Sequence, residues 1–75
     1  MPTLPALTAR KIIRALKKAN FTEDRRKGSH LILINPQTKA RTVVPIHSGK
    51  TIKMPLVYGI IKDAQLTVTE FINLL

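Results

Sequence analysis

The sequence predicts an α+β domain in the order αβββα, in which helices pack on one face of a three-stranded antiparallel sheet and a short helix ends the chain. Two segments, residues 8–19 and 55–65, carry apolar residues three and four positions apart, which is the period of an amphipathic helix. Between them, three short runs at 21–27, 30–35 and 40–46 are separated by turn residues and favour strands. A chain of 75 residues is long enough for one such domain, spanning residues 1–75, and too short for two.

The first predicted helix covers residues 8–19. Thr8 can cap its N-terminus through the side-chain oxygen, and Asn20 can adopt the left-handed conformation that ends a helix. The apolar face consists of Ala9, Ile12, Ile13, Leu16 and Ala19. The opposite face carries Arg10, Arg14, Lys17 and Lys18. This basic face is either solvated or a surface for phosphate groups.

The three predicted strands form a meander. Gly28 and Ser29 are hairpin residues able to take positive φ, and they separate the first strand from the second. Residues 35–39 carry turn chemistry and join the second strand to the third. Apolar side chains of the second strand point to both faces of the sheet, so one set faces away from the helices. That face is either a partner surface or a result of strand packing in a small domain.

The second predicted helix begins at Pro55, which suits a first helical turn, and runs to about Gln65. Its expected buried stripe is Leu56, Ile60, Ile61 and Ala64. Thr67 and Glu70 fit a capping box that opens the last helix. From that helix we expect three side chains to dock on the core: Phe71, Leu74 and Leu75.

Charge is the strongest global signal. Thirteen Lys and Arg residues against four acidic residues give a formal net charge of +9. Such an excess favours a polyanionic partner, either nucleic acid or an acidic protein, although it can also serve solubility alone. Without cysteine the chain has no disulfide and no thiolate metal site. No apolar run is long enough to cross a bilayer, so we expect a cytoplasmic protein that binds no membrane.

Two histidines are the candidate catalytic residues. His30 begins the second strand just after the tight turn, and His47 ends the third. Because the second strand of a meander lies between the other two, these histidines can be neighbours. A metal site is not expected, since it would need acidic or thiolate ligands beside the histidines, and the four acidic residues are expected in a turn or on helices far along the chain.

These residue types match the needs of metal-independent RNA cleavage. RNA supplies its own nucleophile, the 2′-hydroxyl, so an enzyme needs a base, an acid and cations near the phosphoryl group. Ser29 could position a phosphate, and Gly28 lets the backbone approach it. The candidate set is His30 with Arg25, Arg26, Lys27 and His47 or Lys50. A single histidine at a hairpin is also compatible with an ordinary surface or capping role.

Two segments give the sequence a specific pattern, Gly28-Ser29-His30 and the run VPIHSGK at residues 44–50. Together with KIIRALKKANF and IIKDAQLTVTEFINLL, they make a chain that resembles the HicA-type mRNA interferase toxins of type II toxin–antitoxin systems over nearly its whole length. The resemblance implies a double-stranded-RNA-binding-domain-like fold and cleavage of mRNA, with growth arrest, by a protein that is a monomer when free. It also implies neutralisation in a hetero-oligomer with a HicB-type antitoxin, and that the active-site histidine is His30.

The resulting hypothesis is an endoribonuclease that needs no metal or cofactor. His30 is its catalytic base or acid, and His47 and Gly28 are auxiliary. The expected RNA-binding residues are Arg25, Arg26, Lys27, Ser29 and Lys50. The alternative is a non-catalytic module that grips double-stranded RNA through the first helix and the basic hairpin. A third reading is a protein that mainly binds an acidic protein partner.

Overall fold

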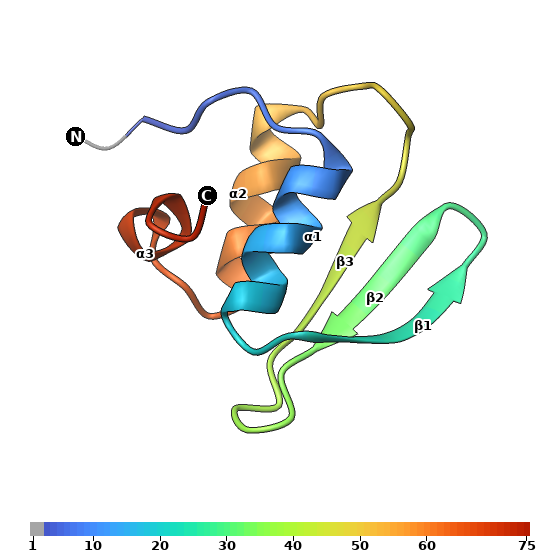
Figure 1. The fold of residues 1–75 in the computed structure, drawn as a ribbon, viewed down its shortest axis with the longest axis vertical. Helices are drawn as coiled ribbons and strands as arrows, with labels where there is room; N and C mark the ends of the chain where they lie inside the picture. The colour runs from blue at the N-terminus through green and yellow to red at the C-terminus, as the bar shows by residue number, and fades with distance from the viewer. Residues whose placement is uncertain (1–2) are drawn as a thin grey trace.

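The computed structural model describes residues 3–75 and shows one helix, three strands and two further helices (Figure 1). The elements are α1 (Ala9–Lys18), β1 (Thr22–Lys27), β2 (His30–Ile34), β3 (Arg41–Pro45), α2 (Met54–Asp63) and α3 (Val68–Ile72). The strands form an antiparallel sheet in the order β1-β2-β3, and both α1 and α2 contact β3. The predicted α+β class is therefore confirmed, with the short C-terminal helix packed against α2.

Capping residues determine where α1 begins and ends, at the positions that the sequence predicts. Thr8 is the N-cap, with its side-chain oxygen accepting from the backbone N–H of Lys11 at 3.4 Å. Asn20 follows the helix with φ 72°, the left-handed conformation expected of it. The buried residues of α1 are Ala9, Ile12, Ala15 and Leu16. One face of α1 thus packs on the core while the basic face stays exposed.

The sheet register determines which side chains face the helices. Leu31 and Leu33 of β2 join the same core as Val44 of β3. Between them, Ile32 is paired with Val43, and these two side chains lie on the opposite face. On the helix side, the hydroxyl of Thr42 donates to the carbonyl of Ile60 at 3.2 Å, a buried bond that joins β3 to α2.

Two turns connect the strands. In the hairpin between β1 and β2, Gly28 takes φ 57°, whereas Ser29, expected to be able to do so, is not in the positive-φ region. After β2, the side-chain oxygen of Asn35 accepts from the backbone N–H groups of Gln37 and Thr38 at 2.9 and 3.3 Å. This side-chain turn explains why residues 35–39 leave the strand conformation.

The buried stripe of α2 differs from the prediction at one position. Leu56, expected in the core, is 46% exposed, and Val57 is fully buried in its place. The buried residues of this helix and its C-cap are Val57, Ile60, Ile61 and Ala64. Their spacing of three, four and seven from Val57 forms a single stripe, and Leu56 lies about 100° away from it around the helix.

The last helix starts as predicted and ends sooner. The backbone N–H of Thr67 donates to the Glu70 carboxylate at 2.8 Å, and that of Glu70 to the Thr67 hydroxyl at 3.1 Å, which completes the capping box. Phe71 is fully buried and Leu74 partly so. Leu75 was expected in the core and is 44% exposed. The helix ends at Ile72, so Leu75 lies three residues after it and does not continue the helical face that carries Phe71. No helix within residues 3–75 is long and apolar enough to span a membrane.

Candidate functional site

A groove of about 520 Å³ lies where the start of β2, the end of β3 and the start of α2 meet. We call it the histidine groove, because both histidines of the chain line it. Its lining residues are His30, Pro45, His47, Lys50, Thr51, Ile52, Lys53, Pro55 and Leu56. The two candidate catalytic residues are therefore brought together, as the meander indicated.

His30 is held by the sheet on both sides. It is the first residue of β2, exposed, and paired with Lys27 in β1 and with Pro45 in β3. Paired residues of antiparallel strands project from the same face, with Cβ atoms about 5 Å apart. The backbone N–H of Ile46 donates to the Ser29 carbonyl at 2.6 Å and extends this pairing past the strand end. The imidazole of His30 thus projects from rigid backbone.

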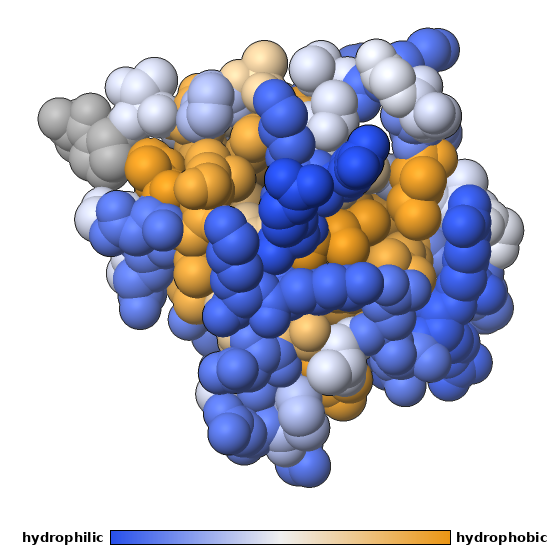
Figure 2. All heavy atoms as spheres, in the orientation of Figure 1, coloured by the Kyte–Doolittle hydropathy of each residue, from blue (hydrophilic) through white to orange (hydrophobic). Residues whose placement is uncertain are grey.

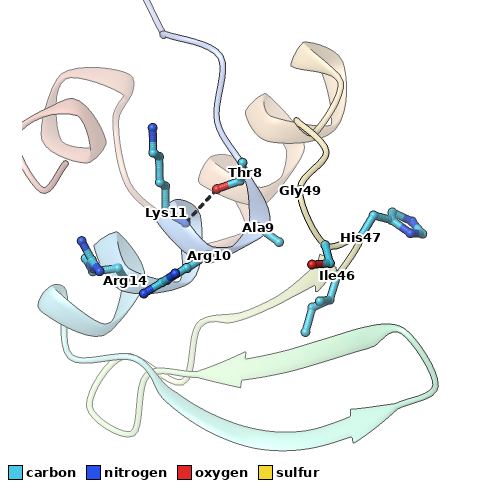
Figure 3. A pocket seen from close by; sticks show the side chains of 9 residues that line it. Thr8, Ala9, Arg10, Lys11, Arg14, Ile46, His47 and Gly49 are labelled. Carbon is cyan, nitrogen blue, oxygen red and sulfur yellow. Dashed lines mark hydrogen bonds between the residues drawn. The ribbon is translucent and has the colours of Figure 1, made fainter.

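His47 and Lys50 lie on a loop that is fixed at several points. The backbone N–H of Lys50 donates to the His47 carbonyl at 3.1 Å and closes a turn. Further on, the backbone N–H of Ile52 donates to the Leu7 carbonyl at 2.8 Å, and Thr51 forms a β-bridge with Thr8. Figure 3 shows the His47 ring pointing away from α1.

Gly49 allows the turn that carries His47 and Lys50, with φ 74°. No atom lies within 4 Å of where a Cβ would stand, so Gly49→Ala introduces backbone strain and no collision. We expect this substitution to lower the free energy of unfolding by about 1–2 kcal/mol. Gly49→Asn should lose less, since asparagine tolerates the left-handed region. Urea unfolding measures both, and an equal loss for the two variants would show that φ is not the cause.

Of the predicted phosphate-binding residues, Lys50 lines the histidine groove and Lys27 is the cross-strand neighbour of His30. Arg25 is on the same face of the sheet, two pairs further along, opposite Ile32. Its guanidinium lies 3.9 Å from the carboxylate of Asp24. Lys27 and Arg25 thus form a row along the face of the sheet that carries His30, and Lys50 lies on the loop that lines the groove beside it.

Three other predicted residues lie outside this row. Arg26 is paired with Leu31 and so projects from the opposite face, where its Nε donates to the Gly28 carbonyl at 3.1 Å. Gly28 and Ser29 form the tip of the hairpin and do not line the histidine groove. In this structure, Arg26 and Gly28 shape the turn that precedes His30.

The sequence reasoning missed Lys53 and the exposed side chain of Leu56. Lys53 is the N-cap residue of α2 and adds a second ammonium group to the groove, while Leu56 forms part of an apolar wall with Pro45. The sequence does contain a signal for the exposure of Leu56, because this residue falls outside the apolar stripe of α2 that starts at Val57. Nothing local marked Lys53, which reaches the groove only because the chain folds back after β3.

The histidine groove combines proton-transfer groups with positive charge. Two imidazoles can each donate or accept a proton, and Lys50 and Lys53 can attract an anion. Among residues 3–75, no carboxylate lines this groove, and no three His, Cys, Asp or Glu residues gather as a metal site would require. The arrangement suits a phosphate-bearing ligand and acid–base chemistry on it.

Comparison with known proteins gives one family. The model of the HicA toxin of bacterial toxin–antitoxin systems matches residues 9–66, which include both histidines and the whole histidine groove. A search of curated proteins finds no match. Because the matched segment covers most of the 75 residues, the chain belongs to the HicA toxin family of bacterial toxin–antitoxin systems.

Proposed function

We propose that this toxin is a metal-independent endoribonuclease that cleaves mRNA and arrests growth until a HicB-type antitoxin neutralises it. The observation that carries the proposal is the placement of His30, His47 and Lys50 in one groove. Family membership supports it, because HicA toxins are generally ribonucleases. RNA is also the kind of polyanion that a net charge of +9 favours.

The proposed reaction is an internal transesterification of RNA. The 2′-hydroxyl oxygen attacks the adjacent phosphorus, and the bond from phosphorus to the 5′-oxygen breaks. The proton of the 2′-hydroxyl passes to one imidazole, and the other imidazole gives a proton to the departing 5′-oxygen. The products are a 2′,3′-cyclic phosphate and a 5′-hydroxyl, so protons and bonds balance without water or metal.

His30 and His47 are proposed as the acid–base pair, with His30 as the main catalytic residue. The ammonium groups of Lys50 and Lys53 stabilise negative charge on the phosphoryl oxygens. Lys27 and Arg25 contact phosphates next to the scissile one, along the face of the sheet that carries His30. Phosphate contacts by Arg26 and Ser29 stay predictions.

His47→Gln should lower the cleavage rate by about 10²–10⁴-fold, the usual contribution of one acid–base group. Glutamine keeps a polar side chain of similar size at an exposed position and cannot exchange protons, so folding should be unaffected. The rate is measured on one RNA under single-turnover conditions, beside Lys62→Gln on α2 as a control. A full rate in His47→Gln would assign the second proton transfer to another group, with Lys50 of the same groove as the next candidate.

The experiment that tests the proposed function incubates the protein with mixed cellular RNA in excess chelator. We expect RNA fragments to accumulate. Saturable, strongly salt-dependent binding with no fragments would overturn the proposal and favour the non-catalytic double-stranded RNA-binding module.

We propose that the antitoxin covers the face of the sheet that the helices leave free. On this face, Val43 is 41% exposed and Ile34 is half-buried. Cross-strand pairing places Arg41 beside Ile34, so apolar and basic side chains adjoin. An antitoxin surface with apolar and acidic residues would fit this face and would cover His30 at its end.

A further inference from the structure

A second groove, of about 540 Å³, lies between the first turns of α1 and the loop that follows β3 (Figure 3). We call it the helix groove. Its lining residues are Thr8, Ala9, Arg10, Lys11, Arg14, Ile46, His47, Ser48 and Gly49. His47 lines this groove and the histidine groove alike, so the two adjoin at that residue.

Positive charge continues from the helix groove along α1. Arg10 and Arg14 are four residues apart, one helical turn, and therefore lie on the same side of the helix. Both also line a shallow depression that reaches Lys17 and Lys18. The row from Arg10 to Lys18 is about 12 Å long, at 1.5 Å per helical residue. Figure 2 shows strongly hydrophilic side chains gathered over α1 on this face.

The charge of Arg10 and Arg14 is not neutralised within the described protein. The salt bridges among residues 3–75 join Lys17 to Glu23 and Arg25 to Asp24. The first turn of α1 carries no acidic residue. Two free guanidinium groups, each able to bind a phosphate through two hydrogen bonds, thus border a groove that leads to the candidate site.

We propose that the RNA strand runs from the histidine groove past His47 into the helix groove, where Arg10 and Arg14 hold phosphates that flank the scissile one. This inference rests on the proposed function and adds a second binding site to it. A strand of regularly spaced phosphates fits a row of cations that begins at the site of reaction. The contacts are to the sugar–phosphate backbone, so they strengthen binding without reading sequence.

The test is the salt dependence of binding to RNA whose riboses are all 2′-O-methylated, which lacks the nucleophile and stays intact. The variant Arg10→Ala/Arg14→Ala is compared with Lys39→Ala/Lys62→Ala, which removes the same charge from exposed positions outside both grooves. Alanine has the highest helix propensity, so α1 should remain folded. Thermal unfolding of both variants checks this.

We expect the Arg10→Ala/Arg14→Ala variant to bind at least about tenfold more weakly, since each lost contact is a charge-assisted hydrogen bond. The slope of log affinity against log salt should fall by about 1.4, or about 0.7 for each single-strand phosphate contact. The control variant should keep the slope of the unaltered protein. An unchanged slope in the Arg10→Ala/Arg14→Ala variant would overturn the inference, and a loss of antitoxin binding alone would assign α1 to the protein partner.

The outcomes separate this inference from the proposed function. RNA cleavage by the unaltered protein, with an unchanged slope in the Arg10→Ala/Arg14→Ala variant, would refute the path over α1 and leave the ribonuclease standing. A reduced slope in a protein that never cleaves RNA would refute the ribonuclease and support the path. No RNA binding by the unaltered protein would refute both.

Discussion

Replacing His30 by glutamine is expected to abolish RNA cleavage, with a loss of about 10²–10⁴-fold or more in the rate of the chemical step. His30 stands at the start of β2, between Lys27 and Pro45, where the sheet fixes its backbone. Glutamine retains hydrogen bonding and loses proton transfer at neutral pH. Single-turnover cleavage of one labelled RNA measures the effect.

The structural control for His30→Gln is its unfolding curve. Position 30 is exposed, and surface substitutions usually change the free energy of unfolding by no more than about 0.5 kcal/mol. A variant with an unchanged unfolding curve and no cleavage would assign the loss to chemistry. Full cleavage by this variant would make His30 an ordinary surface residue of the hairpin.

Replacing Phe71 by alanine is expected to cause the largest loss of stability. Phe71 is fully buried in the core, and removing a buried phenylalanine side chain costs about 3–5 kcal/mol. Because folded domains are stable by only about 5–15 kcal/mol, and small ones lie near the lower limit, much of the variant should be unfolded at 37 °C. Urea unfolding followed by circular dichroism measures the loss.

Leu75→Ala is the matched control for Phe71→Ala. It removes an apolar side chain from the same end of the chain, at a position that is 44% exposed. Its urea midpoint should shift little. Similar midpoints for the two variants would mean that α3 is not packed on the core.

Features decided by local chemistry could be predicted from the sequence. Thr8 and Asn20 mark the ends of α1, and the Thr67 to Glu70 capping box marks the start of α3, because each acts through atoms a few residues away. Gly28 places the hairpin for the same reason. The buried stripe of α2 was harder to predict, since Leu56 and Val57 are adjacent apolar residues and either can start a stripe with helical spacing. Only packing against the sheet selects Val57.

The placement of the candidate site residues could be predicted where it depends on strand order and could not be predicted where it depends on strand register. A meander places β2 beside β3, which brings His30 near His47. The pairing of Arg26 with Leu31 determines from which face of the sheet the Arg26 side chain projects, and no pattern in the sequence fixes that pairing. Lys53 lines the histidine groove and follows, by two residues, the bridge between Thr8 and Thr51, a contact across more than forty residues that no local pattern marks.

The most direct test of the central claim is the chemistry of the RNA ends produced in excess chelator. Mass spectrometry of the fragments distinguishes attack by the 2′-hydroxyl from attack by water. The proposed acid–base pair of His30 and His47 predicts a 2′,3′-cyclic phosphate on one side of the cut and a 5′-hydroxyl on the other. Fragments that end in a 3′-hydroxyl and a 5′-phosphate would contradict it.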